Sequence, residues 1–238
     1  MKFNSLHINN RLSSNIPALL LLFCTALIIS PSYADEPVIE RGEDPATGLK
    51  YWQWDNDGFL LRLTQRLPDQ TRAYFEARGF DVASAEIAAT SCIFQTMIKN
   101  TGTQPSQKIV ATISDWQVVS GKSSKQLLHR EYWRNLWLER NQSQSARVAF
   151  EWSLLPETID YDINDYNWGM SSYGLPPGSQ FDLIFSWKSQ GKTFEGRIDN
   201  VLCPDDIHPE PAALLSIDSN NHFSIITNHT NIYRIIHE

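Results

Sequence analysis

The 238-residue chain has few positive charges and only three cysteines. Lys and Arg total 20 against 27 for Asp and Glu, which gives a net charge of −7. Proteins that bind the nucleic-acid backbone need clustered positive charge, so this deficit argues against a nucleic-acid partner. A hydrophobic content of 42%, with eight Trp, eight Tyr and eleven Phe, indicates a globular domain with an aromatic core.

Common catalytic motifs are also missing from the sequence. It contains no Gly-x-Ser-x-Gly, no phosphate-binding loop, no His-Glu-x-x-His and no Gly-x-Gly-x-x-Gly. Carboxylates are plentiful, but glycoside hydrolysis depends on their separation in space, which sequence spacing does not give. The chain is therefore predicted to be a non-enzymatic binding or assembly protein without a cofactor, with a hydrolase as a lower-ranked alternative.

The first segment, residues 1–34, reads as a secretion signal. An apolar run of about fourteen residues, Ile16–Ile29, follows Lys2 and Arg11 and precedes Ser32–Ala34, where small residues suit a signal peptidase. The run is short for a membrane span, which needs about twenty residues. Cleavage after Ala34 would change the net charge from −7 to −9 and leave a periplasmic or secreted protein. Retention of the segment as a membrane anchor is the alternative.

Two cysteines, Cys92 and Cys203, remain after cleavage. An even pair of thiols in an exported chain predicts a disulfide. The long loop it would close corresponds to roughly 4–5 kcal/mol of stabilisation in the chain-entropy model. No Cys-x-x-Cys motif supports a thioredoxin-like role, and a copper–thiolate site would lack a second nearby sulfur.

Hydrophobic periodicity predicts an order of strands and helices in the remaining chain. Alternation favours strands at 59–64, 92–98, 109–118 and 148–154, and a hairpin over 181–202. Spacings of three and four favour helices at 68–79, 83–89 and 127–140. Residues 156–178 are predicted to be a long loop.

These elements predict a mainly β fold. Consecutive strands joined by tight turns favour antiparallel pairing, and two packed layers bury their faces best. The expected organisation is an extended lead-in over 35–57, one β-sandwich of immunoglobulin-like architecture with two or three helical insertions over 58–204, and a tail over 205–238. The architectural comparison implies no function.

Four strings have the character of family signatures: 67–73 (LPDQTRA), 78–80 (RGF), 165–170 (DYNWGM) and 174–178 (GLPPG). With these strings, residues 58–204 resemble a group of exported bacterial proteins to which no function is attached. The resemblance implies a periplasmic location and brings no site residues with it.

The candidate binding site lies in the predicted loop. Loops this long in compact domains are usually functional or disordered, and disordered segments tend to lack aromatics. The candidate residues combine carboxylates and an amide with aromatic rings: Asp160, Tyr161, Asp162, Asp165, Tyr166, Asn167, Trp168 and Tyr173. Three interpretations stay open, namely a solvated acidic loop whose Trp168 plugs one end of the sandwich, a calcium site, and an aromatic contact surface.

Two further clusters are weaker candidates. His208, His222, His229 and His237 lie in the last 31 residues, without a compact metal-ligand spacing. The predicted helix 127–140 carries arginines that could bind an anion, but interleaved glutamates favour pairing within the helix. No metal ligands are assigned. The leading hypothesis is an exported protein that binds another exported or membrane-associated protein and is not integral to the membrane; the alternative is a periplasmic copper- or calcium-binding accessory protein.

Overall fold

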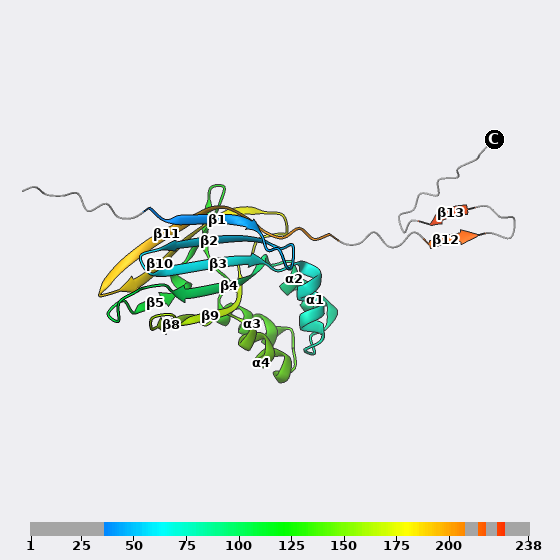
Figure 1. The fold of residues 1–238 in the computed structure, drawn as a ribbon. Coiled ribbons are helices and arrows are strands. Elements are labelled where there is room, and N and C mark those ends of the chain that lie inside the picture. Colours follow the sequence, from blue (N-terminus) through cyan, green and yellow to red (C-terminus); the bar gives the residue numbers. More distant parts are fainter. Residues whose placement is uncertain (1–35, 208–213, 218–222, 227–238) are drawn as a thin grey trace, which may run out of the picture. The chain divides into compact units, whose positions relative to one another are not determined.

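The computed structural model describes residues 36–207, 214–217 and 223–226. Two antiparallel sheets and four α-helices make up the first of these ranges (Figure 1). In the described part of the chain, no helix has both the length and the apolar character needed to cross a bilayer.

Sheet A contains five strands, four of which are neighbours in both sequence and space. Their order is β1 (Val38–Glu43), β2 (Lys50–Asn56), β3 (Phe59–Gln65), β4 (Ile93–Asn100) and β9 (Tyr166–Ser172). β9 pairs with β4 along its whole length, so Trp168 lies opposite Met97.

Sheet B is built around a long hairpin. Its strands are β5 (Ile109–Thr112), β6 (Gln117–Ser120), β7 (Ser123–Gln126), β8 (Thr158–Tyr161), β10 (Gln180–Ser189) and β11 (Lys192–Leu202). One edge of β10 pairs with β11 and the other pairs with β6 and β5 in succession, with the 3-10 turn Ile113–Asp115 between these two. Gln190 and Gly191 close the hairpin with positive φ at both positions, as a two-residue turn of this hand requires. Separately, β12 (Leu214–Ile217) pairs with β13 (Phe223–Ile226).

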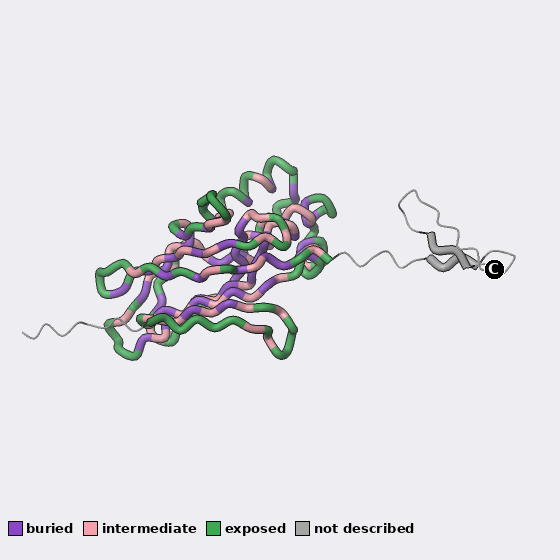
Figure 2. The backbone as a smooth tube through the Cα atoms, turned by 90° about the horizontal axis from the view of Figure 1, so that it is seen from above, coloured by how far each residue is buried: buried purple, intermediate pink, exposed green. Residues whose placement is uncertain are grey.

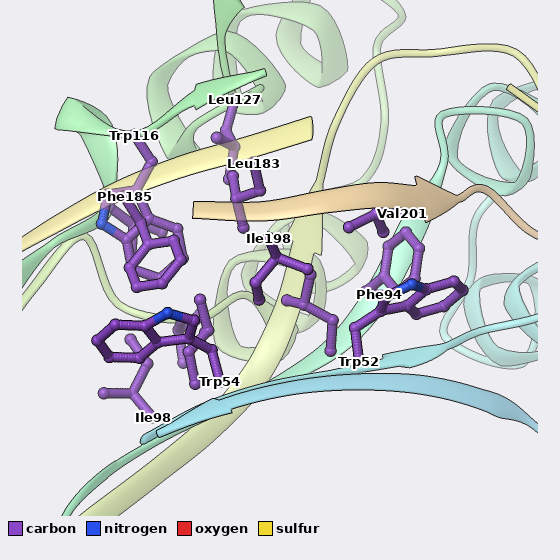
Figure 3. Close-up of a cluster of buried hydrophobic side chains, with 14 of the residues drawn as sticks. Trp52, Trp54, Phe94, Ile98, Trp116, Leu127, Leu183, Phe185, Ile198 and Val201 are labelled. Carbon is purple, nitrogen blue, oxygen red and sulfur yellow. The ribbon is translucent and has the colours of Figure 1, made fainter. Parts of the chain in front are cut away.

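The main core lies between the two sheets. Figure 3 shows Trp52 and Trp54 of β2 pointing toward side chains of the opposite sheet. The Trp54 ring centroid lies 5.2 Å from that of Phe185 and 5.1 Å from that of Trp187, both on β10. Alternate residues of every central strand are buried here, as expected for two packed sheets (Figure 2). The prediction of a mainly β antiparallel sandwich with helical insertions is confirmed. The immunoglobulin-like part of the prediction is not confirmed, because β1 to β4 are sequential neighbours in sheet A, which an immunoglobulin sheet does not show.

The helices form a second core at one end of sheet A (Figure 1). They are α1 (Pro68–Glu76), α2 (Val82–Ala89), α3 (Arg130–Glu139) and α4 (Gln144–Ser153). Phe75, Trp133, Trp137 and Phe150 bury their rings together with Ile93 and Met170 from the outer face of sheet A. The helical layer therefore covers the outer face only at the end where these two residues lie.

Two links fasten the end of β11 to sheet A and the helices. Cys92, one residue before β4, and Cys203, one residue after β11, form the predicted disulfide, which joins the two sheets. Beyond it, the Arg72 guanidinium on α1 lies 2.6 Å from Asp206 and 2.6 Å from Glu86 on α2. The hydrogen bonds that Arg72 donates to Glu86 and Asp206 raise its pKa above the ordinary value. The ordered core therefore reaches past the predicted start of the tail at residue 205.

Residues 148–154 were predicted to be a strand, and this is wrong. The segment belongs to α4, where the Ser143 side chain caps the helix by accepting a hydrogen bond from the Ala146 amide. Ala146 and Phe150, four residues apart, are buried on one helix face. Val148 and Trp152, also four apart, fall on the opposite, exposed face.

The predicted long loop over 156–178 is also wrong, because it contains β8 and β9. β8 joins sheet B and β9 joins sheet A. At the other end of the domain, the lead-in over 35–57 contains β1 and β2, whose Trp52 and Trp54 belong to the main core. The two tryptophans of the predicted lead-in therefore belong to the core, and the sandwich begins at Val38.

Gly169 lets the chain after α4 wrap around the edge of sheet A. Leu154 packs into the helical core and Leu155 into the main core, while the Leu155 amide donates to the Met170 carbonyl at 2.9 Å. A Cβ atom at Gly169 would lie 2.5 Å from the Leu155 nitrogen and 2.7 Å from its Cα. These are backbone atoms, which cannot swing aside.

We expect Gly169→Ala to lower the free energy of unfolding by about 1–3 kcal/mol, in the range of other overpacked cores. Denaturant titration measures this. The control is Gly42→Ala on edge strand β1, where the new Cβ would meet only the end of the Tyr51 ring at 3.3 Å. That change should cost less than about 0.5 kcal/mol. Equal losses in the two variants would contradict the backbone contact.

Candidate functional site

The structure separates the residues of the predicted binding loop into three groups. Tyr161 and Tyr173 are buried in the main core, the carboxylates lie around the β8–β9 turn, and Tyr166 and Trp168 are exposed on β9. Asn167 is half-buried and lies opposite Ile98, on the inner side of sheet A. The eight residues therefore do not form one surface.

The two buried tyrosines have structural roles. The Ser171 hydroxyl donates to the Tyr173 oxygen at 3.0 Å, and the Tyr173 amide donates to the Cys92 carbonyl at 3.1 Å. Burial raises the pKa of the Tyr161 phenol and that of the Tyr173 phenol above their ordinary value. Neither ring reaches a surface from which it could contact a ligand.

The acidic side chains of the turn do not converge. Asp165 accepts a hydrogen bond from the Asp162 amide at 3.1 Å and so closes the turn. The Asp162 carboxylate lies 3.3 Å from the Lys108 ammonium, and Asp160 is exposed on β8. Within the described residues, no group of three His, Cys, Asp or Glu side chains could hold a metal ion. The four tail histidines considered in the sequence lie outside the described residues.

Tryptophan exposure singles out one surface. Six of the eight tryptophans are at most 6% exposed, whereas Trp152 is 85% and Trp168 is 64% exposed. Tyr166, on the same face of β9 as Trp168, is 62% exposed. We call Val148, Trp152, Tyr166 and Trp168 the aromatic surface. Burying such rings contributes strongly to binding, so their exposure makes this surface the candidate contact site.

The backbone brings the two halves of the aromatic surface to the same border of sheet A. Leu154 forms a parallel bridge with Met170. The segments that contain Leu154 and Met170 run in the same direction at this bridge. Trp152 comes two residues before Leu154, and Trp168 comes two residues before Met170. Met170 is covered by the helical core, but Trp168 is not. Tyr166 and Trp168 thus lie where the helical layer ends and the outer face of sheet A becomes open, and Trp152 lies in the last turn of α4, just before the bridge.

Ion pairs fix the helices beside this surface. Glu151 of α4 lies 3.0 Å from the Arg134 guanidinium and 3.9 Å from that of Arg130, both on α3. The hydrogen bond from Arg134 lowers the pKa of Glu151 below its ordinary value. Of the arginines considered in the sequence as an anion site, Arg130 and Arg134 therefore pair with a carboxylate of α4 and not, as expected, within their own helix.

A separate pocket of about 500 Å³ opens where the edge of sheet A meets the edge of sheet B. Arg41 of β1 donates to the Asp199 carbonyl of β11 at 2.9 Å, which links the two edges. The lining mixes positive Arg41 and Lys50 with negative Glu43, and all three are exposed. Exposed charges of both signs define no single class of ligand for this pocket.

Comparisons with protein-family models, curated proteins and solved structures find no match for this chain. Its function must therefore be inferred from the geometry alone. The sequence patterns missed Trp152 because alternation placed it on a strand. The signal that would have found it is Ser143 as a helix cap, followed by Ala146 and Phe150 four residues apart.

Proposed function

We propose that the protein is exported and, without acting as an enzyme, binds another exported or membrane-associated protein through the aromatic surface. The observation that supports this proposal most directly is that Trp152 and Trp168 are exposed while the other six tryptophans are buried. Trp and Tyr are the residues most often responsible for the energy of protein interfaces. The disulfide-linked sandwich supports this role because it holds Tyr166 and Trp168 on a paired strand before binding, and the pairing of Glu151 with Arg134 holds α4, which carries Trp152.

The charges next to the aromatic surface indicate what the partner presents. Asp162 and Asp165 lie in the turn that leads directly into Tyr166, and both are exposed. Asp165 also closes the turn and Asp162 lies 3.3 Å from the Lys108 ammonium, yet both carboxylates stay exposed to a partner. Complementarity favours a partner with an apolar centre and a basic rim.

Export rests on the sequence pattern of residues 1–34 and is supported by the disulfide, since such bonds persist mainly outside the cytosol. The group of exported bacterial proteins that residues 58–204 resemble gives the same location. We infer that the mature chain begins at Asp35 and works in the periplasm or outside the cell. Mass spectrometry of protein from the native compartment tests this, and a chain that keeps residues 1–34 would contradict cleavage.

Site-specific photo-crosslinking in producing cells tests the surface. A photoreactive side chain at position 168 or 152 should give one predominant adduct with an exported or membrane-associated protein, and the yield should saturate. The control is the same probe in place of Val82, which is 72% exposed on α2 outside the aromatic surface. Adduct yields at 152 and 168 no higher than at 82, or adducts only with cytosolic proteins, would overturn the proposal.

A further inference from the structure

Strand β1 forms the edge of sheet A that lies opposite to β9 in the strand order. Every residue from Val38 to Glu43 is exposed or half-buried, and no other segment of the described chain pairs with the outer side of this strand. Ile39 lies opposite Trp54 and so faces the main core, yet it remains 42% exposed. An open edge strand of this kind is a place where another chain can pair.

The hairpin between β1 and β2 determines which backbone groups of β1 face outward. The Asp44 amide donates to the Leu49 carbonyl at 2.9 Å, so these two residues form a hydrogen-bonded pair. Along an antiparallel ladder such pairs alternate with non-bonded pairs, whose amides and carbonyls point away from the partner strand. The register of β1 and β2 therefore directs the amide and carbonyl of Ile39, Arg41 and Glu43 outward.

The pocket of about 500 Å³ lies beside these outward groups. Its lining includes Arg41 and Glu43 of β1, together with Trp52 and Leu202. Because Arg41 lies opposite Trp52, the side chains at positions 41 and 43 point to the inner side of sheet A. Alternate side chains of a strand added to β1 would point to the same side. Peptide-binding sheet edges work in this way, since backbone bonds supply affinity and pockets for alternate side chains supply specificity.

The charges of β1 indicate which chain can pair with it. Gln53 donates to Glu40 at 3.3 Å and Arg41 donates to the Asp199 carbonyl at 2.9 Å, so these contacts with neutral groups leave both charges unmatched. Two antiparallel registers would bond nearly all of β1 to a second copy, and they place Glu40 opposite Glu40 or Arg41 opposite Arg41. Like charges directly opposite each other destabilise a sheet, so a different chain is favoured.

We propose that an extended segment of another protein adds to β1 as an antiparallel strand and bonds to the outward backbone groups of Ile39, Arg41 and Glu43. The segment carries an acidic side chain opposite Arg41, a basic side chain opposite Glu40 and an apolar side chain opposite Ile39. The apolar side chain covers Ile39, and the acidic one meets Arg41 beside the pocket. The site does not rest on the aromatic surface, because β1 and β9 are opposite edges of sheet A.

Amide hydrogen exchange of the full chain, followed by nuclear magnetic resonance, tests the site. The probe is the capped peptide Lys-Thr-Glu-Lys-Val-Val, whose order matches β1 in the antiparallel direction. In the chain alone, the amides of Ile39, Arg41 and Glu43 should exchange faster than those of Glu40 and Gly42, which bond to β2. Saturating peptide should slow the exchange of the three outward amides at least about tenfold.

Two control peptides separate backbone pairing from charge. Methylation of the peptide nitrogens that would donate to β1 should abolish the slowing. The peptide with exchanged charges, Glu-Thr-Lys-Glu-Val-Val, should bind at least about fivefold more weakly. The double variant Glu40→Lys with Arg41→Glu should reverse this preference, whereas Lys122→Glu in the exposed β6–β7 turn should keep it. Thermal unfolding shows that both variants are folded.

Three results would overturn the site. One is the absence of any slowing at millimolar peptide, and another is equal slowing by the methylated peptide. The third is protection of the three outward amides in the chain alone. Protection that falls on dilution would then assign the edge to a second copy, and protection that persists would assign it to the chain's own residues.

Discussion

Replacing both cysteines, Cys92→Ala with Cys203→Ala, is expected to lower the free energy of unfolding by about 5 kcal/mol. The bond closes a loop with a sequence separation of 111 residues, and the chain-entropy model gives this value for such a loop. For a domain of this size the loss corresponds to a fall in melting temperature of about 10–20 °C. Because native domains are stable by only about 5–15 kcal/mol, the variant should be close to its unfolding threshold.

Non-reduced peptide mapping and thermal unfolding with and without reductant measure this effect. The Cys92 and Cys203 peptides should be linked in exported protein, and reductant should lower the melting temperature of the parent chain but not of the double variant. Free, alkylatable thiols at both positions would contradict the bond. A loss below about 1 kcal/mol would show that the two sheets hold together without it.

Phe150→Ala is the second change with a large expected effect, about 3–5 kcal/mol, typical for removal of a buried aromatic ring. Its ring centroid lies 4.6 Å from that of Phe75, 5.0 Å from that of Trp133 and 5.1 Å from that of Trp137. The side chain thus joins α4 to α1 and α3. Near-ultraviolet circular dichroism of the tryptophans should weaken together with stability.

Val148→Ala on the same helix is the control for Phe150→Ala. Val148 is exposed, so its truncation should change the free energy of unfolding by less than about 0.5 kcal/mol. If segment 148–154 were the strand that its alternation suggests, Phe150 and Trp152 would share one face and show similar losses. A large loss for Trp152→Ala would therefore contradict the helix.

The fold was predictable wherever local pattern and long-range packing agree. The hairpin of β10 and β11 alternates from its Gln190–Gly191 turn as far as Leu183 and Ile198, so its strands and turn are confirmed, while a bulge beyond Ile198 buries Val201 where alternation expected Asn200. In α4 the same residues satisfy both a period of two and a spacing of four, and alternation alone cannot choose between them. The Ser143 cap and the burial of Phe150 against other helices decide in favour of the helix.

The site was less predictable because it depends on which sheet each strand joins. Tyr161 and Tyr166 are five residues apart, yet β8 pairs in sheet B and β9 in sheet A, so one ring is buried and the other exposed. Strand partners far apart in sequence set this outcome. The binding role of Tyr166 and Trp168 stays a prediction.

The affinity of the purified protein for the partner identified by crosslinking tests the proposed function most directly. We expect Trp152→Ala and Trp168→Ala each to weaken binding at least tenfold, since interface tryptophans commonly contribute more than about 1.4 kcal/mol. Both variants should keep the parent melting temperature within about 2 °C, because neither ring is buried in the free protein. Val82→Ala should bind like the parent chain. Unchanged affinity in both tryptophan variants, with the fold intact, would contradict the assignment of the aromatic surface.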